Sequence, residues 1–360
     1  MSNIADFDRP NVVSLFTGAG GLDLGLEKAG FDIKVCVEWE HDRCETLRLN
    51  RPEWPVMQAN IRRIKGEDIL SFGGLEKEEV ALISGGPSCQ PFSKSAFWVK
   101  DRLSKIASDP RALLLQDYVR VVKEIEPRAV ILENVHGLAF KPIRSIFAAL
   151  TDSLEQQGYR CSWSILNSAD YGVPQRRKRL FLVGTRQDLA FNFPTPTHFH
   201  QKLGNVSAHV TAGEAIGDLD DDIIHENEKI GGKWGHLLPL IPPGRNYLYL
   251  TERGGGPLPL FKWRSRYWSF LLKLSPREPS WTIQARPGPY TGPFHWRNRR
   301  LRLSEIKRLQ TFPDDWKLFG DSRSKWSQVG DAVPPLIAKV LGKALFGKYS
   351  HMFSNRGNVN

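Results

Sequence analysis

One cysteine stands in a setting that suits a nucleophile. Residues 80–83 form an apolar run that predicts a buried strand, and a Ser-Gly-Gly-Pro-Ser segment leads from it to Cys89. Open α/β sheets bind ligands in the crevice outside the carboxyl ends of their strands. A thiol held there can attack a ligand through its thiolate. The alternative is a buried structural cysteine, which the surrounding prolines, glycines and polar residues disfavour.

A carboxyl group is expected to reach the same crevice, and two arginines further along the chain are expected to point the same way. The apolar run 128–132 ends in Glu133, which the sheet rule places beside Cys89. Further on, four consecutive cations precede another apolar run, and the two-residue period of a strand turns Arg177 and Arg179 to one side. A helix-capping Glu-Asn pair and a solvated basic edge are the alternatives for these two stretches.

The N-terminal residues predict a pocket for a nucleoside cofactor that lacks a pyrophosphate. A strand over 11–16, a glycine turn over 17–21 and a helix over 22–29 bring backbone close to a ligand. Asp23 stands where the dinucleotide fingerprint requires its third glycine. The next strand ends in Glu38, whose carboxylate can accept hydrogen bonds from ribose, and the tryptophan after it can stack on adenine. A solvated glutamate and a core tryptophan are the alternative.

The composition favours a large intracellular protein with a polyanionic partner. The chain has 360 residues and a formal net charge of +11. Its four cysteines have neither paired nor metal-like spacing, which predicts a reducing cytosol, no disulfide framework and no zinc site. No apolar run is long enough to span a bilayer, and the first ten residues lack the apolar core of a signal peptide.

From about residue 187 to about residue 276 the alternation of strands and helices gives way to proline, glycine, histidine and aromatic residues. Arg245, Lys262 and Arg264 are interleaved with aromatic side chains there, a combination that suits phosphates and bases. The basic stretch 94–110, which follows the cysteine, is the kind of long connection that forms a lid.

These stretches resemble, in the same order and over nearly the whole chain, the motifs of the DNA cytosine-5 methyltransferases of bacterial restriction-modification type. The cysteine loop is similar to the family's Pro-Cys-Gln-x-Phe-Ser, with Ser88 in place of the proline. Glu-Asn-Val at 133–135, Gln-x-Arg-x-Arg at 175–179 and Gly-Asp-Ala-Val at 330–333 match further motifs. The resemblance implies an α/β fold of the S-adenosylmethionine (SAM)-dependent, Rossmann-like methyltransferase class. Its mixed, mostly parallel sheet carries helices on both faces, and a smaller irregular target-recognition domain is added to it.

The resemblance also implies an activity. The methyl group of SAM passes to C5 of a cytosine that is flipped out of a short specific sequence of double-stranded DNA. Cys89 is the implied nucleophile, Glu133 acts near the ring N3, and Arg177 and Arg179 supply positive charge. A monomeric, cytoplasmic enzyme of a bacterium or archaeon is implied, functionally paired with a restriction endonuclease.

Binding residues follow from the same resemblance. The implied cofactor-binding residues are Phe16, Gly18, Gly20, Gly21, Glu38, Trp39, Asn60, Ile61, Leu114, Asp331, Ala332 and Val333. The implied DNA-binding residues are Pro87, Gln90, Ser93, Asn134, Gln175, Arg245, Lys262 and Arg264. Two cofactor positions depart from the family, since Asn60 replaces an aspartate and Asp331 an asparagine. Asn60 can still accept a hydrogen bond through its amide oxygen, whereas the extra negative charge of Asp331 has no explanation in the sequence.

The resemblance divides the chain into two domains. Residues 1–186 and 318–350 are expected to form the catalytic, SAM-binding domain, and 351–360 a tail. Residues 187–317 are expected to form the target-recognition domain, including an arginine-rich motif at 278–316. In that motif, Ser304 is the expected N-cap of a helix.

Three other functions are weighed against this one. An RNA (tRNA) cytosine-5 methyltransferase is disfavoured because the RNA-acting relatives carry a further cysteine motif, and this chain has no cysteine after Cys161. A catalytically silent DNA-binding relative is favoured only by Ser88, Asn60 and Asp331. An oxidoreductase is disfavoured by the missing dinucleotide pattern.

Overall fold

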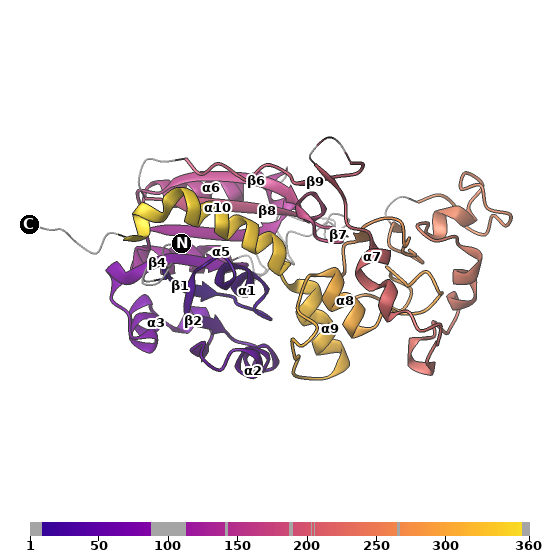
Figure 1. Ribbon diagram of the computed structural model, residues 1–360, viewed down its shortest axis with the longest axis horizontal. Helices are drawn as coiled ribbons and strands as arrows, with labels where there is room; N and C mark the ends of the chain where they lie inside the picture. Colours follow the sequence, from indigo (N-terminus) through magenta and orange to yellow (C-terminus); the bar gives the residue numbers. More distant parts are fainter. Residues whose placement is uncertain are drawn as a thin grey trace, which may run out of the picture.

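The computed structural model describes residues 9–87, 113–140, 143–186, 190–202, 204, 206–264 and 267–354. Within these residues, seven strands form one sheet in the order β3-β2-β1-β4-β5-β8-β6 (Figure 1). The neighbouring strands β3, β2, β1, β4 and β5 pair in parallel, and β8 runs antiparallel to β5 and β6. The mixed, mostly parallel sheet expected from the sequence is therefore confirmed. The strands are β1 (Asn11–Leu15), β2 (Asp32–Glu38), β3 (Val56–Gln58), β4 (Val80–Gly85), β5 (Ala129–Val135), β6 (Arg160–Asn167) and β8 (Lys178–Thr185).

The central strands β4 and β5 are mostly apolar, with polar residues only toward their carboxyl ends, because both faces of the sheet are covered. Every residue of β4 and β5 is buried. Successive side chains of β5 alternate between two cores, so that Ile131 joins one core and Val130 and Leu132 join the other.

Helices lie on both faces of the sheet. Helices α1 (Gly21–Glu27), α2 (His41–Asn50) and α10 (Pro335–Ser354) belong to the first core, and α10 crosses the sheet beside α1 (Figure 1). Helices α3 (Gly66–Gly73), α5 (Leu114–Ile125) and α6 (Arg144–Glu155) belong to the second core. The end of the chain thus returns to the sheet and packs against its first helix.

Helix α5 shows how sequence and packing agree. Its buried residues Leu115, Tyr118, Val121, Val122 and Ile125 follow the spacing of one helix face. The Tyr118 hydroxyl lies 3.3 Å from the Ile83 carbonyl oxygen and 3.0 Å from that of Ile131, which anchors the helix to β4 and β5. This places the N-terminal end of α5 beside the carboxyl ends of those strands.

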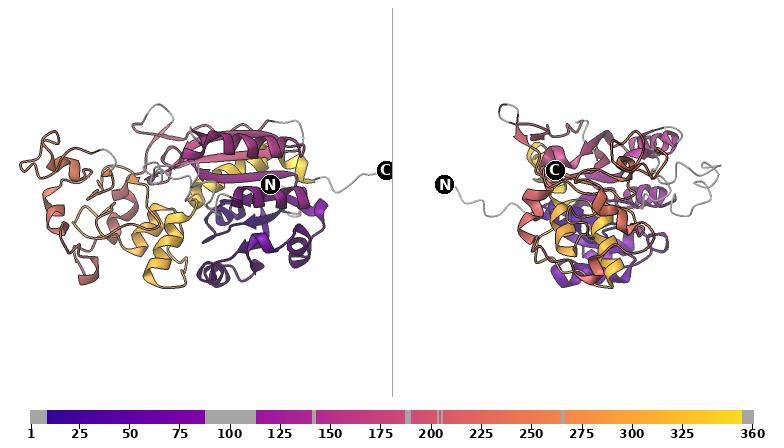
Figure 2. Two further views of the ribbon diagram at one scale, coloured as in Figure 1. Left: turned by 180° about the vertical axis from the view of Figure 1, so that it is seen from behind. Right: turned by 90° about the vertical axis from the view of Figure 1, so that its right-hand side faces the viewer.

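The other end of the molecule has little regular structure (Figures 1 and 2). It packs around its own apolar core, which includes Leu238, Ile241, Leu250, Leu271 and Phe294. Helices α7 (Ala212–Ile216), α8 (Leu303–Leu309) and α9 (Ser322–Asp331) lie between this core and the sheet. Short strands complete the structure: β7 (Gln175–Arg176) with β11 (Ser280–Trp281), and β9 (His198–Phe199) with β10 (Ser207–Ala208). No helix in the described part of the chain combines the length and apolarity needed to cross a membrane.

The expected N-cap of α8 is wrong by two residues. The helix begins at Leu303, with Arg302 in the N-cap position, and Ser304 lies inside its first turn. The Glu305 carboxylate accepts a hydrogen bond from the Arg302 amide at 2.7 Å and pairs with the buried Arg299 guanidinium, also at 2.7 Å. A carboxylate held by these two groups fixes the start of the helix in place of a serine hydroxyl.

The contact between α1 and α10 gives the first testable prediction. A Cβ atom at Gly25 would lie 2.3 Å from Ala338 Cβ and 2.4 Å from the Pro335 carbonyl oxygen, both in the first turn of α10. We expect Gly25→Ala to lower the free energy of unfolding by about 1–3 kcal/mol, because α10 must move away from α1. Thermal unfolding followed by circular dichroism measures the loss. The matched control is Gly217→Ala, where φ is −64° and a Cβ meets nothing within 4 Å. Equal unfolding temperatures for the two variants would contradict the described packing.

Candidate active site

A cavity of about 470 Å³ lies at the carboxyl ends of β1, β2, β4 and β5. It is the place where the sheet rule puts a ligand. Most of the residues singled out in the sequence line it, although they come from distant parts of the chain. These are Phe16, Gly18, Gly21, Glu38, Trp39, Asn60, Ile61, Pro87, Leu114, Glu133, Arg177, Arg179, Asp331, Ala332 and Val333.

The glycine turn and the end of β2 form one wall of the cavity. The Glu38 side chain is almost fully buried, and its Oε2 accepts a hydrogen bond from the Gly18 amide at 2.8 Å. Its Oε1 accepts bonds from the amides of Trp39 at 2.8 Å and Glu40 at 2.9 Å. Trp39 is 66% exposed, so its side chain stands at the rim of the cavity, where a ligand can cover it.

Glu133 and Arg179 form the opposite wall. The Arg179 Nε lies 3.0 Å from Glu133 Oε1, and both side chains are largely buried. Burial raises the pKa of Glu133, and the positive charges of Arg179 and Arg177 only partly offset the rise. A carboxyl group with a raised pKa can retain a proton and donate it to a bound ligand.

The cysteine loop starts beside Glu133. A Cβ atom on Gly86 would lie 3.3 Å from Glu133 Oε2, and the Asn134 side-chain amide donates to the Pro87 carbonyl oxygen at 3.1 Å. The end of β4 is thereby tied to the end of β5. Cys89, Gln90 and Ser93 lie outside the described residues.

Arg177 is buried and reaches across to the C-terminal half of the chain. Its guanidinium donates to the carbonyl oxygens of Asp331 at 3.2 Å and Ile283 at 3.4 Å. Thus Arg179 contacts the Glu133 carboxylate, whereas Arg177 contacts the segments on the other side of the cavity.

Several predicted residues lie away from the cavity. Gly20 packs against Leu47, with φ of +79°, a conformation that glycine adopts without strain. Gln175 is fully buried and connects two segments, since its amide donates to the Gln310 side chain at 2.9 Å and its oxygen accepts from the Ile283 amide at 3.0 Å. Asn134 is also fully buried. Arg245, Lys262 and Arg264 are exposed residues of the irregular part.

The cavity also contains charged residues that the sequence did not single out as ligand contacts. Asp23 is fully buried in its wall, and Glu40, Arg43, Arg62 and Arg286 line it as well. Arg43 donates to Asp331 at 2.9 Å and pairs with Glu40 at 2.8 Å. In the sequence, only the position of Arg43, five residues after Glu38, could have indicated that it lies in the cavity wall. Nothing in the sequence connects Arg43 to Asp331.

Comparison with known proteins identifies the family. The sequence model described as C-5 cytosine-specific DNA methylase matches residues 10–347. The chain belongs to this family. It is 40% identical to the type II methyltransferase M.SacI of Streptomyces achromogenes, over 95% of this chain and 94% of that protein. It is 30% identical to M.NgoMIV of Neisseria gonorrhoeae, over 92% and 96% of the two chains.

Solved structures show the same fold. A putative DNA modification methyltransferase encoded within an E. coli prophage matches with a TM-score of 0.65 and 24% identity, over 94% of this chain and 98% of the other. A Spodoptera frugiperda DNMT2 mutant also matches with a TM-score of 0.65, at 15% identity, over 93% and 99%. The expectation of a DNA cytosine-5 methyltransferase that uses SAM is confirmed by family membership.

The residues of the cavity fit SAM. Gly18, with φ of +62°, leaves space beside the Glu38 carboxylate, since an added Cβ would have no neighbour closer than 3.7 Å. SAM carries a sulfonium and an ammonium group, and acidic side chains in the cavity lining, among them Glu40 and Asp331, suit these positive charges. An apolar and aromatic rim of Phe16, Trp39 and Ile61 suits an adenine ring.

The buried Asp23 gives a prediction about pH. Burial raises its pKa from 3.8 to about 6, and a hydrogen bond with Ser14 offsets part of the rise. The folded chain therefore holds this proton more tightly than the unfolded chain, so the stabilisation is present below pH 3.8 and is lost as the pH rises through about 6.

Asp23→Asn removes this titration. We expect the variant to gain stability relative to the native chain between about pH 4 and pH 7, by up to about 3 kcal/mol, because one pKa unit corresponds to about 1.4 kcal/mol. Urea unfolding of both proteins across this range measures the difference. A difference that does not change with pH would show that Asp23 has an ordinary pKa.

Proposed function

We propose that this protein methylates C5 of one cytosine within a short specific sequence of double-stranded DNA, with Cys89 as the nucleophile. The observation that carries the proposal is the convergence on the cofactor cavity of Glu133, Arg179, and Gly86 and Pro87, which lead to the cysteine loop. Only an extruded base can reach such a recessed site, so the target cytosine leaves the duplex.

The chemistry assigns a task to each side chain. The Cys89 thiolate adds to C6 of the cytosine, which places electron density on C5. Glu133 gives a proton to N3 as negative charge develops there, and Arg179 orients the Glu133 carboxyl. SAM, when bound, supplies the electrophilic methyl group. Loss of the C5 proton and departure of Cys89 then release the methylated base.

The surroundings of the other three cysteines support Cys89 as the nucleophile, because they disfavour a thiolate. Burial raises the pKa of Cys36 well above its usual range and those of Cys44 and Cys161 to about 12. None of these three thiols lines the cavity. A thiolate at neutral pH is therefore expected only from the remaining cysteine of the chain.

Binding roles are proposed for the other predicted residues. Glu38, Trp39 and Asn60 hold the adenosine part of SAM, and the walls formed by the glycine turn and by residues 331–333 enclose the remainder. Gln175 and Asn134 act through the segments they brace, since both are fully buried. Arg245, Lys262 and Arg264 contact phosphates of the DNA, while the exposed rings of Trp263 and Trp268 are available to bases.

The proposed domains follow the same division of labour. Residues 1–186 and 318–350 form the catalytic domain, 187–317 form the target-recognition domain, and 351–360 form a tail. The separate apolar core of the irregular part and the packing of α10 on α1 support this division. We also propose a cytoplasmic monomer that works alongside a restriction endonuclease, as the type II methyltransferase names of the relatives suggest.

Bisulfite sequencing tests the proposed function. DNA from a methylation-free bacterial host that expresses the protein should show one short sequence with a fully protected cytosine. The host that expresses Cys89→Ser should show none, because no C6 adduct can form. Protection at cytosines without a shared sequence, or methyl transfer to tRNA alone, would contradict the proposal.

Trapping tests the covalent step. Duplex DNA with 5-fluorocytosine at the target should form a complex that survives denaturing electrophoresis, because fluorine cannot leave C5 as a proton does. We expect the adduct with the native protein and with Cys161→Ser, and none with Cys89→Ser. An active enzyme that forms no adduct would require a different mechanism.

A further inference from the structure

Arg43 occupies an unusual position for a cation. It lies in the first turn of α2, where the helix dipole disfavours positive charge, and its side chain is only 14% exposed. Burial alone would lower its pKa, but the nearby carboxylates of Glu38, Asp331 and Glu40 raise it. Arg43 therefore stays charged in the cavity wall, held by acidic neighbours from two ends of the chain.

The geometry of these contacts leaves one edge of the guanidinium unused. The Arg43 Nε pairs with Glu40 Oε2 at 2.8 Å, and Nη2 donates to Asp331 Oδ2 at 2.9 Å. Nη1 makes no hydrogen bond to any residue in the described ranges, and it would lie 3.7 Å from a Cβ atom on Gly18. This nitrogen thus faces the glycine turn of the cofactor cavity.

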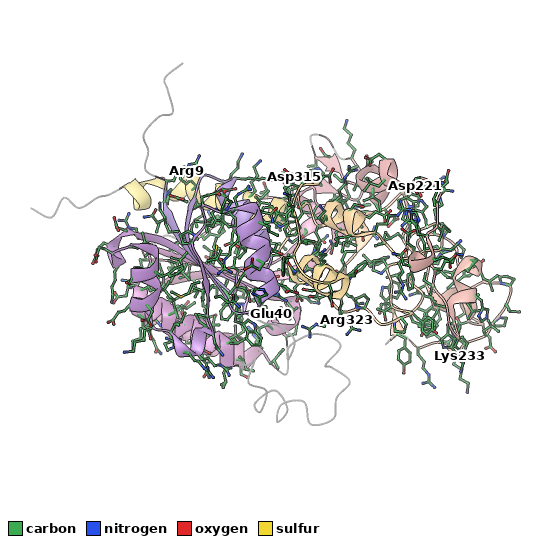
Figure 3. The ribbon with its side chains drawn as sticks, turned by 90° about the horizontal axis from the view of Figure 1, so that it is seen from below. Arg9, Glu40, Asp221, Lys233, Asp315 and Arg323 are labelled. Carbon is green, nitrogen blue, oxygen red and sulfur yellow. The ribbon has the colours of Figure 1, made fainter. Side chains whose placement is uncertain are left out.

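Asp331 connects Arg43 to Arg177 across the cavity lining. Its carboxylate accepts from Arg43, and its backbone carbonyl accepts from Arg177 at 3.2 Å. Helix α2, which carries Arg43, is hydrogen-bonded to the C-terminal part of the chain at two further points. Thr46 donates to the Gln328 side chain at 2.6 Å, and the Asn50 side chain accepts from the Lys317 amide at 2.8 Å. In Figure 3, Glu40 lies at the middle of the molecule, far from Lys233 at the outer end of the irregular part.

We propose that Arg43 binds the carboxylate of the methionine part of SAM, and that Asp331 is an aspartate here because it orients this arginine. The proposal rests on SAM being the cofactor and deepens the proposed function. SAM has one anionic group, and a guanidinium edge in its cavity pairs most favourably with that group. An asparagine at 331 would hold Arg43 with a neutral and weaker hydrogen bond.

The other arginines of the cavity lining have partners within the protein or come from the irregular part of the chain. Arg179 pairs with Glu133, Arg62 pairs with Asp117 at 3.2 Å, and Arg177 donates to backbone carbonyls. Arg286 also lines the cavity, but it is exposed and comes from the irregular part of the chain. It is the competing candidate and so provides a matched control.

Binding of two cofactors separates a contact with the carboxylate from a merely structural role. Isothermal titration without DNA gives the affinities for SAM and for decarboxylated SAM, which lacks only the carboxylate. We expect the native protein to prefer SAM by about tenfold or more. Arg43→Met should weaken SAM binding by about that factor and leave the affinity for decarboxylated SAM equal or higher, because the acidic neighbours then face a dication.

Adding Asp331→Asn to Arg43→Met should restore part of the lost affinity for SAM. The second substitution removes a carboxylate that would otherwise lie unpaired next to the carboxylate of SAM. Arg286→Met should leave the preference for SAM unchanged. Equal losses for both cofactors in Arg43→Met, or loss of the preference in Arg286→Met, would overturn the inference. If Arg43→Met fails to fold, Arg43→Lys, which keeps the positive charge, allows the same comparison of the affinities for SAM and decarboxylated SAM. A native protein that binds neither cofactor would refute the proposed function instead.

Discussion

The ion pair between Glu133 and Arg179 is the contact on which the site depends. A carboxylate at the end of a fully buried strand needs a compensating cation, and the neighbouring strand supplies it. This is possible because β8 runs antiparallel to β5, which sets Arg179 opposite Val135 and within reach of Glu133. On the other side, parallel β4 brings Gly86 against the same carboxyl group. Strand β5 thus holds the Glu133 carboxyl group between Gly86 and Arg179.

The second requirement is closure of the cavity by the end of the chain. Asp331, Ala332 and Val333 line the cavity just before α10, which packs on α1 below the glycine turn. A Cβ at Gly21 would lie 2.2 Å from the Val333 carbonyl oxygen, so a glycine is needed for the two segments to meet. Gln175, Gln310 and the backbone around residue 329 continue this connection inward. The glycine turn, residues 331–333 and Gln175 are therefore parts of one packed unit.

The irregular part is organised by buried charge as well as by apolar contacts. Arg299 is almost fully buried and pairs with Glu305, which in turn fixes the start of α8. The serine N-cap expected at 304 is wrong because the Glu305 carboxylate binds the Arg302 amide and the Arg299 guanidinium, which starts the helix at Leu303. By contrast, Trp263 and Trp268 of this part are exposed.

The sequence by itself determined β1, β2, β4, β5 and β8 of the sheet, the glycine turn and the polar residues at the ends of these strands. Apolar runs and turn residues are local signals, and the sheet rule places the ends of the strands at one crevice. Only the tertiary structure decided which of those residues face the cavity: Glu38 and Glu133 do, whereas Gly20 and Gln175 brace the surroundings. It alone paired Arg43 with Asp331, 288 residues apart, and buried Asp23 in the wall. Such contacts depend on how whole segments pack, and no local periodicity encodes them.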